Sequence, residues 1–358
     1  MPALTPTIAV DAMGGDQAPR AEVEGAVRAA SELGVPVTLV GPEDALHKEL
    51  RLRETRGIPI EVVHASEAIS MQDRAARAVR QKRDSSIRTA MRLMRDGRAA
   101  GVVSAGNTGA VMATAKIVLG TLPSVDRPGL AAIFPRIGSA PTGNHTAGSI
   151  LIDVGANVDC KPEQLRQFAV MGATYAHLLW NIPAPRVGLL SVGSEESKGN
   201  DLTRETYRLL EHSSLNFIGN VEGRDLYNGS VDVIVCDGFT GNVALKISEG
   251  LADAVKVFLR KSFLRGGDGQ PTGQSSDAAL SQVFEKISRE MDYVEAGGAL
   301  LLGVKGVCMI CHGSSSPRAI ASAIRITSEF AASGLNEKME AELQKLSQPS
   351  LSKRRQAR

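Results

Sequence analysis

Short apolar runs alternate with longer helical patterns along almost the whole chain. Most of these runs are apolar at successive positions, which is typical of strands buried on both faces of a parallel sheet. Nine runs predict strands, at Thr7 to Val10, Val37 to Val40, Ile58 to His64, Gly101 to Ser104, Ser149 to Val154, Arg186 to Val192, Asn216 to Ile218, Val231 to Cys236 and Gly306 to Cys311.

Apolar residues at helical spacing lie between the runs. They include Val23, Ala26, Val27, Ala30 and Leu33 after Pro19, and Leu165, Phe168, Ala169 and Gly172 after Pro162. The alternation of strands and helices predicts an α/β fold, with a doubly wound, mostly parallel sheet and helices on both faces. We expect residues 1–346 to form a single α/β domain.

One segment departs from this alternation. Between residues 251 and 293, two helical patterns flank the connector RGGDGQPTGQSS, whose composition does not suit a packed core. We expect a projecting helical hairpin at 251–293 and a disordered basic tail at 347–358. The hairpin is either an ordinary surface feature or a contact site for a membrane surface or a partner. The candidate contact residues are Phe258, Leu259, Arg260, Lys261 and Phe263.

The charge of the chain is nearly balanced, with 41 Lys and Arg residues against 39 Asp and Glu residues among 358. A protein built to bind nucleic acid would carry a basic excess, so we expect no nucleic-acid partner. The sequence has no run of about 18 apolar residues, and its start lacks the regions of a signal peptide. We therefore expect a cytoplasmic protein.

Four cysteines in a chain of this length do not make a disulfide framework, so we expect reduced thiols. Cys308, Cys311 and His312 have the spacing of a c-type haem attachment site or a redox pair. The alternative is a buried strand that leads His312 into a loop, which we favour because haem attachment normally accompanies export. We expect no cofactor and no metal ion.

Polar, glycine-rich loops follow six of the predicted strands. Their sequences are DAMGGD, SAGNTGA, DVGANVD, SVGSEESKGN, CDGFTGN and CHGSSS. Ligands of open α/β sheets bind beyond the carboxyl ends of the strands, so we expect one large site shared by the six loops. Gly14 and Gly15 would let backbone N–H groups approach an anion, and phosphate is the natural candidate. The motifs of P-loop nucleotide sites, dinucleotide sites and serine hydrolases are absent from the sequence.

The loops are rich in neutral hydrogen-bonding side chains, which suit a bound anion and a developing oxyanion. Each could equally serve its own turn, because Asn and Gly are ordinary turn residues. The candidate binding residues are Asp11, Gly14, Gly15, Asp16, Asn107, Thr108, Gly109, Asn157, Asn200, Thr240, Gly241 and Asn242, with the cations Lys198 and Lys246. A further cationic group either holds a phosphate or an acidic partner or is a solvated helix face. It consists of Arg77, Arg80, Lys82 and Arg83.

Eight segments, taken in order, resemble the signatures of the bacterial phosphate acyltransferase family, PlsX. They are IAVDAMGGDQAP, SAGNTGA, DRP, DVGANVD, SEESKGN, FIGNVEGRD, CDGFTGNVALK and HGSS, and they run from Ile8 to Ser315. The resemblance implies an enzyme that moves a long-chain fatty acyl group from acyl carrier protein to inorganic phosphate. Its product, acyl phosphate, would serve the first acylation of glycerol 3-phosphate in phospholipid synthesis. The implied fold is the doubly wound one shared with phosphotransacetylases and isopropylmalate dehydrogenases, usually as a homodimer.

The implied chemistry gives roles to some of the loop residues. A phosphate oxygen would attack the thioester carbon directly, so positioning and oxyanion stabilisation would carry the catalysis. Lys198 would contact phosphate or the oxyanion, with Lys246 as a second candidate, and a structural salt bridge is the alternative for each. His312 would take a proton from phosphate or give one to the departing thiolate, unless it only caps its loop. Asp11 and Asp16 would orient the site, and Cys160 and Cys311 are not needed as acyl acceptors.

The resemblance also implies partners. Acyl carrier protein is strongly acidic, so we expect a basic docking patch, either around Arg80 or at Arg260, Lys261 and Arg265. The product would pass to a membrane-bound glycerol-phosphate acyltransferase. This implies peripheral association with the inner face of the membrane.

Three other functions stay open. A short-chain phosphotransacetylase using coenzyme A would differ mainly in its acyl pocket. A nicotinamide-dependent dehydrogenase of the isopropylmalate type would need a cluster of metal-binding aspartates, whereas the aspartates here lie in separate loops. A non-catalytic, membrane-associated scaffold of lipid synthesis would keep the hairpin without needing the polar loops.

Overall fold

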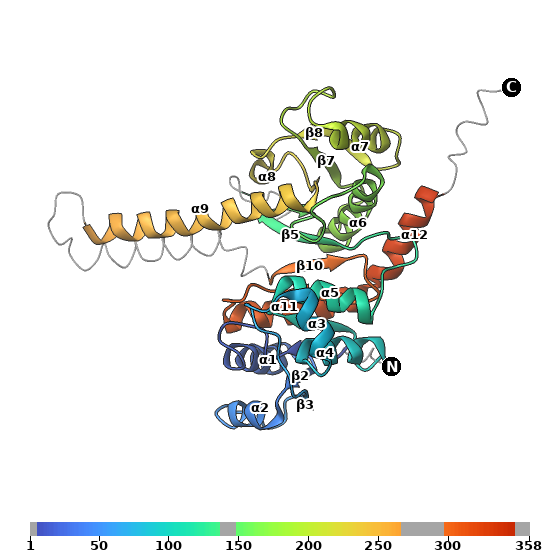
Figure 1. Ribbon diagram of the computed structural model, residues 1–358. Helices are drawn as coiled ribbons and strands as arrows, with labels where there is room; N and C mark the ends of the chain where they lie inside the picture. The colour runs from blue at the N-terminus through green and yellow to red at the C-terminus, as the bar shows by residue number, and fades with distance from the viewer. Residues whose placement is uncertain (1–5, 137–147, 266–296, 348–358) are drawn as a thin grey trace.

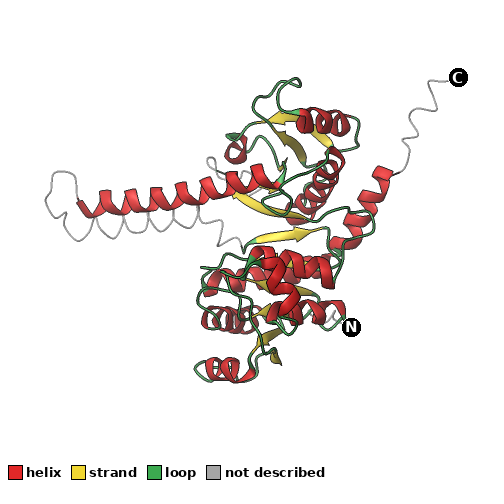
Figure 2. Cartoon of the chain, viewed as in Figure 1, coloured by secondary structure: helices red, strands yellow, loops and turns green. Residues whose placement is uncertain are grey.

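The computed structural model describes residues 6–136, 148–265 and 297–347, which form one sheet of eleven strands with helices on both faces (Figures 1 and 2). The strand order is β3-β2-β1-β4-β11-β10-β5-β6-β9-β7-β8. The strands are β1 (Ile8–Asp11), β2 (Val37–Gly41), β3 (Ile60–His64), β4 (Gly101–Ser104), β5 (Gly129–Pro135), β6 (Gly148–Ile152), β7 (Arg186–Leu190), β8 (Asn216–Val221), β9 (Val233–Val235), β10 (Ala299–Leu302) and β11 (Val307–Ile310). The helices are α1 (Arg20–Leu33), α2 (Glu43–Leu50), α3 (Ala75–Gln81), α4 (Ser86–Arg95), α5 (Thr108–Val118), α6 (Pro162–Trp180), α7 (Asp201–Glu211), α8 (Asp225–Asn228), α9 (Gly238–Arg265), α11 (Pro317–Ser333) and α12 (Leu335–Ser347).

The sheet has two halves whose strands run in opposite directions. Strands β3, β2, β1, β4 and β11 are parallel to one another, and so are β6, β9, β7 and β8. Between the halves, β10 pairs antiparallel with both β11 and β5, and β5 pairs antiparallel with β6. Figure 1 shows β10 and β5 at the junction. Three successive antiparallel pairings therefore reverse the strand direction from one half to the other.

All nine predicted strands are present, and the doubly wound, mostly parallel fold is confirmed. The prediction missed β5 and β10, the two strands of the junction. Their segments, GLAAIFP and ALLL, are short apolar runs, and periodicity alone does not distinguish such a run from part of a buried helix. The missed strands are thus the ones that set the direction of the second half.

Each face of the sheet carries its own apolar cluster. In β1, Ile8 and Val10 belong to one cluster and Ala9 to the other, as the alternation of side chains along a strand requires. The first cluster includes the apolar faces of α1, α6, α7, α11 and α12, and the second includes those of α3, α4, α5 and α8. Each fully buried large apolar side chain, such as Phe168 of α6, stabilises the fold by about 1.5–3 kcal/mol. This packing holds the strand ends from which the polar loops emerge.

Helix α9 begins earlier than the predicted hairpin. The segment CDGFTGN was expected to be a loop, but the helix starts within it, at Gly238. The carboxylate of Asp237 accepts hydrogen bonds from the N–H and the hydroxyl of Thr240, at 2.9 and 2.8 Å, and caps the first turn. From there α9 extends away from the sheet (Figure 1).

Two further predictions about this part of the chain fall outside the described residues. They are the return arm of the hairpin, within residues 266–296, and the basic tail after Ser347. The side chains of Leu259, Arg260, Lys261 and Phe263 also lie outside the description, whereas Phe258 is 69% exposed. No helix in the described ranges is long and apolar enough to cross a membrane.

Candidate functional site

The six polar loops form two groups. The first loop group, DAMGGD, SAGNTGA and CHGSSS, follows β1, β4 and β11, three neighbouring parallel strands. The second loop group, DVGANVD, CDGFTGN and SVGSEESKGN, follows β6, β9 and β7, which are also neighbours and parallel. The two halves run in opposite directions along the sheet, so the six loops divide into these two groups, and a single large site shared by all six stays a prediction. Each group by itself still lies at the carboxyl ends of adjacent parallel strands, where α/β proteins bind ligands.

Asp11 ends β1 and holds the first loop group together. Its side chain is buried and accepts hydrogen bonds from the hydroxyl of Ser104 at 2.7 Å and the N–H of Met13 at 3.3 Å. A further hydrogen bond joins it to Ser86, in the first turn of α4. Burial raises the pKa of Asp11, and these hydrogen bonds oppose the rise. The Asp11 carboxyl group thereby orients the start of the DAMGGD turn.

Neighbouring atoms of the protein leave no room for a side chain at either of the paired glycines of this turn. A Cβ on Gly14 would lie 2.7 Å from the backbone nitrogen of Gly106, and a Cβ on Gly15 would overlap Oε1 of Glu22. The N–H of Gly15 donates a hydrogen bond of 3.0 Å to the same Oε1 atom. Close packing between loops and helix therefore explains both glycines without a ligand, and phosphate binding at this turn stays a prediction.

The sequence analysis missed Glu22, in the first turn of α1. Its side chain is buried, with 1% of the residue exposed, and its Oε2 atom has no hydrogen-bond partner in the described part of the chain. Burial, reinforced by the negative charges of Asp11 and Asp16, raises the pKa of Glu22 to about 7. The available signal was spacing, because Glu22 precedes Ala26 and Ala29 by four and seven positions and so shares their buried helix face.

Asn107 serves the structure of the first loop group. Its Oδ1 atom accepts the N–H of Ala110 at 3.1 Å and caps α5. Its amide group donates to the carbonyl oxygens of Met71 and Asp73, at 3.2 and 3.1 Å. Asn107 therefore serves its own turn, which is the alternative given above for the polar residues of the loops. The next residue, Thr108, is exposed at the start of α5, where a ligand could reach it.

His312 lies exposed in the loop after β11. Its Nδ1 atom accepts the N–H of Ser314 at 3.2 Å, so the neutral ring carries its hydrogen on Nε2. The same loop contacts the DAMGGD turn, because the carbonyl oxygen of Gly313 accepts the N–H of Asp16 at 2.8 Å. His312 therefore caps its loop through one ring nitrogen and can donate through the other.

Asp153 organises the second loop group, and the sequence analysis missed it as well. Five hydrogen bonds of 2.7–3.1 Å reach its carboxylate, from the N–H groups of Leu130, Gly155, Ala156 and Asn157 and from the Asn157 amide. Burial raises the pKa of Asp153, and these donors oppose the rise. The Asn157 amide also donates to the carbonyl oxygen of Pro128 at 2.7 Å, so both of its hydrogens are used inside the protein.

Four candidate residues lie on α9 rather than in a loop, namely Thr240, Gly241, Asn242 and Lys246. A Cβ on Gly241 would overlap the carbonyl oxygen of Asp153, so close packing explains this glycine. Asn242 is exposed. Lys246 pairs with Glu249 at 2.7 Å, which agrees with the salt-bridge alternative. An exposed pair of this kind contributes about 0–1 kcal/mol to stability.

The SVGSEESKGN loop carries Lys198 on an exposed surface. The N–H of Lys198 donates to the carbonyl oxygen of Glu195 at 3.0 Å, and across the described ranges no carboxylate pairs with its ammonium group. Asn200 accepts the N–H of Thr203 at 2.9 Å and caps α7. Of the two candidate lysines, Lys198 is thus the one without an acidic partner there. It belongs to the second loop group, whereas His312 belongs to the first.

The cationic group on and after α3 lies beside the first loop group. Arg77, Arg80 and Arg83 are exposed, while Lys82 pairs with Asp73 at 2.6 Å. The Asp73 carbonyl oxygen is one of those held by Asn107, which connects this segment to the SAGNTGA loop. Three arginines therefore present positive charge next to the loops.

All four cysteines are free thiols. Burial raises the pKa of Cys160 to about 11 and that of Cys308 to about 12, and it also raises the pKa values of Cys236 and Cys311. A protonated thiol is a poor nucleophile, so none of these residues is suited to accept an acyl group. Among the described residues, no group of His, Cys, Asp and Glu is arranged to hold a metal ion.

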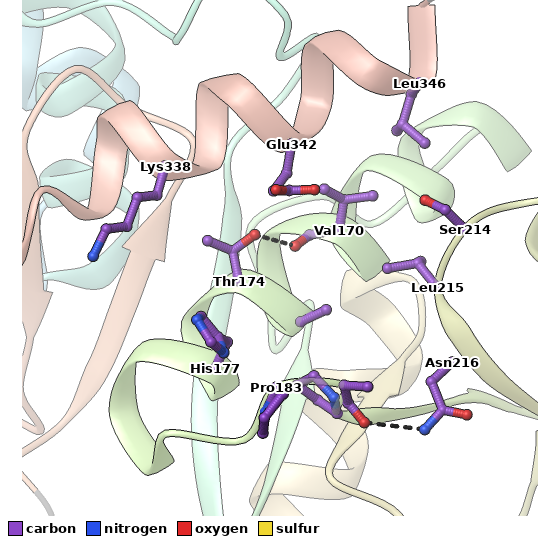
Figure 3. Close-up of a pocket in the computed structure, with 13 residues that line it drawn as sticks. Val170, Thr174, His177, Pro183, Ser214, Leu215, Asn216, Lys338, Glu342 and Leu346 are labelled. Carbon is purple, nitrogen blue, oxygen red and sulfur yellow. Dashed lines mark hydrogen bonds between the residues drawn. The ribbon is translucent and has the colours of Figure 1, made fainter.

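A cavity of about 330 Å³ lies between α6, α12 and the amino ends of β7 and β8 (Figure 3). Its lining includes Thr174 and Asn216, which already hydrogen bond to carbonyl oxygens of Val170 and Ala184. Because the second loop group follows the carboxyl end of β7, this cavity is separate from it.

Comparison with known proteins identifies the family. The family described as "Fatty acid synthesis protein" matches residues 6–338. A protein of Acidobacterium capsulatum named phosphate acyltransferase is 52% identical over 337 residues, 94% of this chain and 96% of the relative. A Geobacter protein of the same name is 51% identical over 336 residues, 93% of this chain and 91% of the relative.

The fold is also found among solved structures. A phosphotransacetylase from Streptococcus pyogenes superposes with a TM-score of 0.60 and 17% identity, over 92% of this chain and 94% of that one. At this identity the likeness concerns the fold alone. The identity to the two relatives goes further, and the chain therefore belongs to this fatty acid synthesis family of acyltransferases, as the resemblance to the PlsX signatures implied.

Proposed function

We propose that this chain transfers a long-chain fatty acyl group from acyl carrier protein to inorganic phosphate and releases acyl phosphate. The observation that carries the proposal is the 52% identity, over nearly the full length of both chains, to a protein named phosphate acyltransferase. The two groups of polar loops agree with it, because direct transfer to phosphate needs positioned hydrogen-bond donors rather than a covalent nucleophile.

In the proposed reaction, a phosphate oxygen attacks the carbonyl carbon of the acyl thioester. The carbonyl oxygen becomes an oxyanion, and its collapse breaks the carbon–sulfur bond to give acyl phosphate and a thiolate. We assign the exposed ammonium group of Lys198 to the charge of the phosphate or the oxyanion. Because Nδ1 of His312 accepts the N–H of Ser314, the hydrogen on Nε2 suits a hydrogen bond to the oxyanion or the departing thiolate better than acceptance of a proton from phosphate.

Acyl carrier protein is the proposed donor, and Arg77, Arg80 and Arg83 are its proposed docking residues. They are exposed next to the first loop group, and an acidic partner would be steered to them electrostatically. Charge reversal at Arg80 should raise the KM for the acyl carrier protein substrate and leave the KM for phosphate unchanged. An equal rise in both constants would count against docking at this face.

We also propose that the protein is a homodimer, with α9 as the contact helix. Phe239, Val243, Ile247 and Leu251 recur at intervals of four residues, so they lie along one side of α9, and all are exposed. Within the described part of a single chain this apolar strip is exposed, and a second copy would cover it.

Peripheral attachment to the inner face of the membrane is the remaining proposal, so that acyl phosphate is released near a membrane-bound glycerol-phosphate acyltransferase. Phe258, farther along α9, is 69% exposed. In liposome flotation, Phe258→Glu should reduce binding because a charge would replace an apolar contact. The control is Leu52→Glu, which changes another exposed apolar residue, on a different segment. Undiminished flotation of Phe258→Glu would reject this contact.

The experiment that tests the function traps acyl phosphate with hydroxylamine. The purified chain is incubated with phosphate and palmitoyl-acyl carrier protein, palmitoyl-coenzyme A or acetyl-coenzyme A. Phosphate-dependent hydroxamate from the carrier-protein substrate is expected. Product from acetyl-coenzyme A alone would instead indicate a short-chain phosphotransacetylase, and no product from any donor would favour the scaffold.

A further inference from the structure

Three backbone N–H groups of the DAMGGD turn, those of Met13, Gly15 and Asp16, already have acceptors inside the protein. The pairs are Met13 to Asp11 Oδ1 at 3.3 Å, Gly15 to Glu22 Oε1 at 3.0 Å and Asp16 to the Gly313 carbonyl oxygen at 2.8 Å. An anion that binds this turn through any of these three N–H groups must therefore compete with an acceptor of the protein. At Gly15 the competitor is a buried carboxyl group that can change its charge.

The charged groups that act most strongly on Glu22 are acidic. They are Asp11, at the end of β1, and Asp16, in the DAMGGD segment, and their negative charges raise the pKa of Glu22. The charge of Glu22 likewise raises the pKa of the Cys311 thiol. Helix α11 packs against α1, and the ionisable residues in the loop before it and in its first turn are His312 and Arg318, both exposed. In the described part of the chain no cation forms a salt bridge with Glu22. Its ionised form therefore adds a negative charge beside the turn that no salt bridge among the described residues offsets.

Two buried polar atoms in this region lack a hydrogen-bond partner among the described residues. They are Oε2 of Glu22 and Oγ of Ser315, in the loop that contacts the turn through Gly313. Buried polar atoms without partners are exceptions in folded proteins, and a functional role is one of the explanations for them. Glu22 also lies next to a turn that sequence and family resemblance both connect with phosphate.

We propose that Glu22 is a positioning residue that sets the affinity of the DAMGGD turn for a phosphate-like dianion. In its ionised form, the carboxylate holds the Gly15 N–H strongly, because charged acceptors make stronger hydrogen bonds, and its charge repels the anion. In its protonated form, both effects are relieved. Burial raises the pKa of Glu22 to about 7, so the affinity should fall as the pH rises through that value. The inference rests on the proposed function, which requires bound phosphate, together with the sequence-based prediction that phosphate binds at this turn.

Sulfate is the appropriate probe because it remains a dianion throughout the neutral range, whereas phosphate itself titrates there. Its Kd for the full chain is measured by calorimetry at about pH 6 and about pH 8, at constant ionic strength. Wild type is expected to lose affinity about tenfold between the two. Glu22→Gln keeps an oxygen for the Gly15 N–H without the charge, and it should match wild type at the lower pH and stay nearly constant.

Glu24→Gln is the matched control, since Glu24 is exposed on the same helix and should leave the pH dependence of wild type intact. Equal pH dependence in all three proteins would overturn the proposal. If Glu22→Gln fails to fold, the wild-type titration decides by itself, because a sulfate affinity that is constant from about pH 5 to 9 would also overturn it.

The same samples separate this inference from the proposed function. Sulfate binding that weakens through pH 7, with no acyl phosphate in the hydroxylamine assay, would reject the transferase and retain the role of Glu22. If wild type binds neither sulfate nor phosphate, the role of Glu22 is rejected whatever the transferase assay gives. A role confined to folding would change the melting temperature of Glu22→Gln and leave the pH profile of the sulfate Kd as in wild type.

Discussion

Gly14 and Gly106 bring the backbones of two loops into contact, since a Cβ on Gly14 would lie 2.7 Å from the backbone nitrogen of Gly106. Backbone cannot move aside as the end of a flexible side chain can. Gly14→Ala should therefore lower the free energy of unfolding by about 1–3 kcal/mol, as overpacking does elsewhere, in urea denaturation. Gly223→Ala is the control, because its Cβ would meet no atom within 4 Å. Equal losses in both variants would contradict the packing argument.

Replacing Asp153 by Asn should destabilise the second loop group. The carboxylate accepts five hydrogen bonds, whereas an amide offers one oxygen and turns N–H donors toward the N–H groups around it. The expected loss in free energy of unfolding is about 3 kcal/mol. Asp159→Asn changes an exposed aspartate of the same loop and should cost little. A small loss at Asp153 would mean that these hydrogen bonds are replaced elsewhere.

Glu22 should make stability depend on pH. Its pKa is raised from 4.5 to about 7 in the folded chain, so the folded state holds the proton more tightly than the unfolded state. The stability that this provides is fully present below about pH 4.5 and is lost as the pH rises through 7. Relative to wild type, Glu22→Gln should therefore gain up to about 3 kcal/mol above pH 7 and little at pH 4.5, in urea denaturation. A gain that is the same at both pH values would refute this.

Lys198→Ala should lower the rate of acyl phosphate formation about 100-fold, the magnitude found when a donor to a developing oxyanion is removed. The side chain is exposed, so the melting temperature should not change. Lys305→Ala is the control, because Lys305 is an exposed lysine just before β11, at its amino end. Full activity of Lys198→Ala would reject the role assigned to Lys198 and would favour His312 and the first loop group as the source of the hydrogen-bond donors.

Ile247→Glu should convert the proposed homodimer to a monomer. Ile247 is 64% exposed in the single chain, so the substitution should spare the fold, but an interface would have to bury the new charge. Sedimentation velocity measures the change, and Leu52→Glu serves as a control away from α9. Dimeric Ile247→Glu protein would place any subunit contact elsewhere.

Much of the fold could be predicted from local sequence. Continuous apolar runs marked nine strands, because a strand buried on both faces has no polar positions to interrupt it. The polar loops at their ends were also visible. Some signals were present and not used, such as Asp237 three residues before Thr240, which is typical of a helix start and not of a loop.

The assignment of site residues was less complete, because a residue type does not reveal its partners. Asn107, Asn157 and Asn200 were named as possible ligand donors, and the structure uses all three to cap helices or brace loops. Asp153 and Glu22 were missed for the opposite reason. Their importance lies in burial, which depends on elements distant in the sequence.

The sequence by itself determined which segments become strands, helices and polar loops, since those choices depend on periodicity and on residues a few positions apart. Only the tertiary structure decided the direction of the second half, through the pairing of β5 and β10, and with it the division of the loops into two groups. It also decided which groups meet at Gly14, Gly15 and Glu22. Strand direction, close approach and desolvation are properties of neighbours in space, and a pattern along the chain does not contain them.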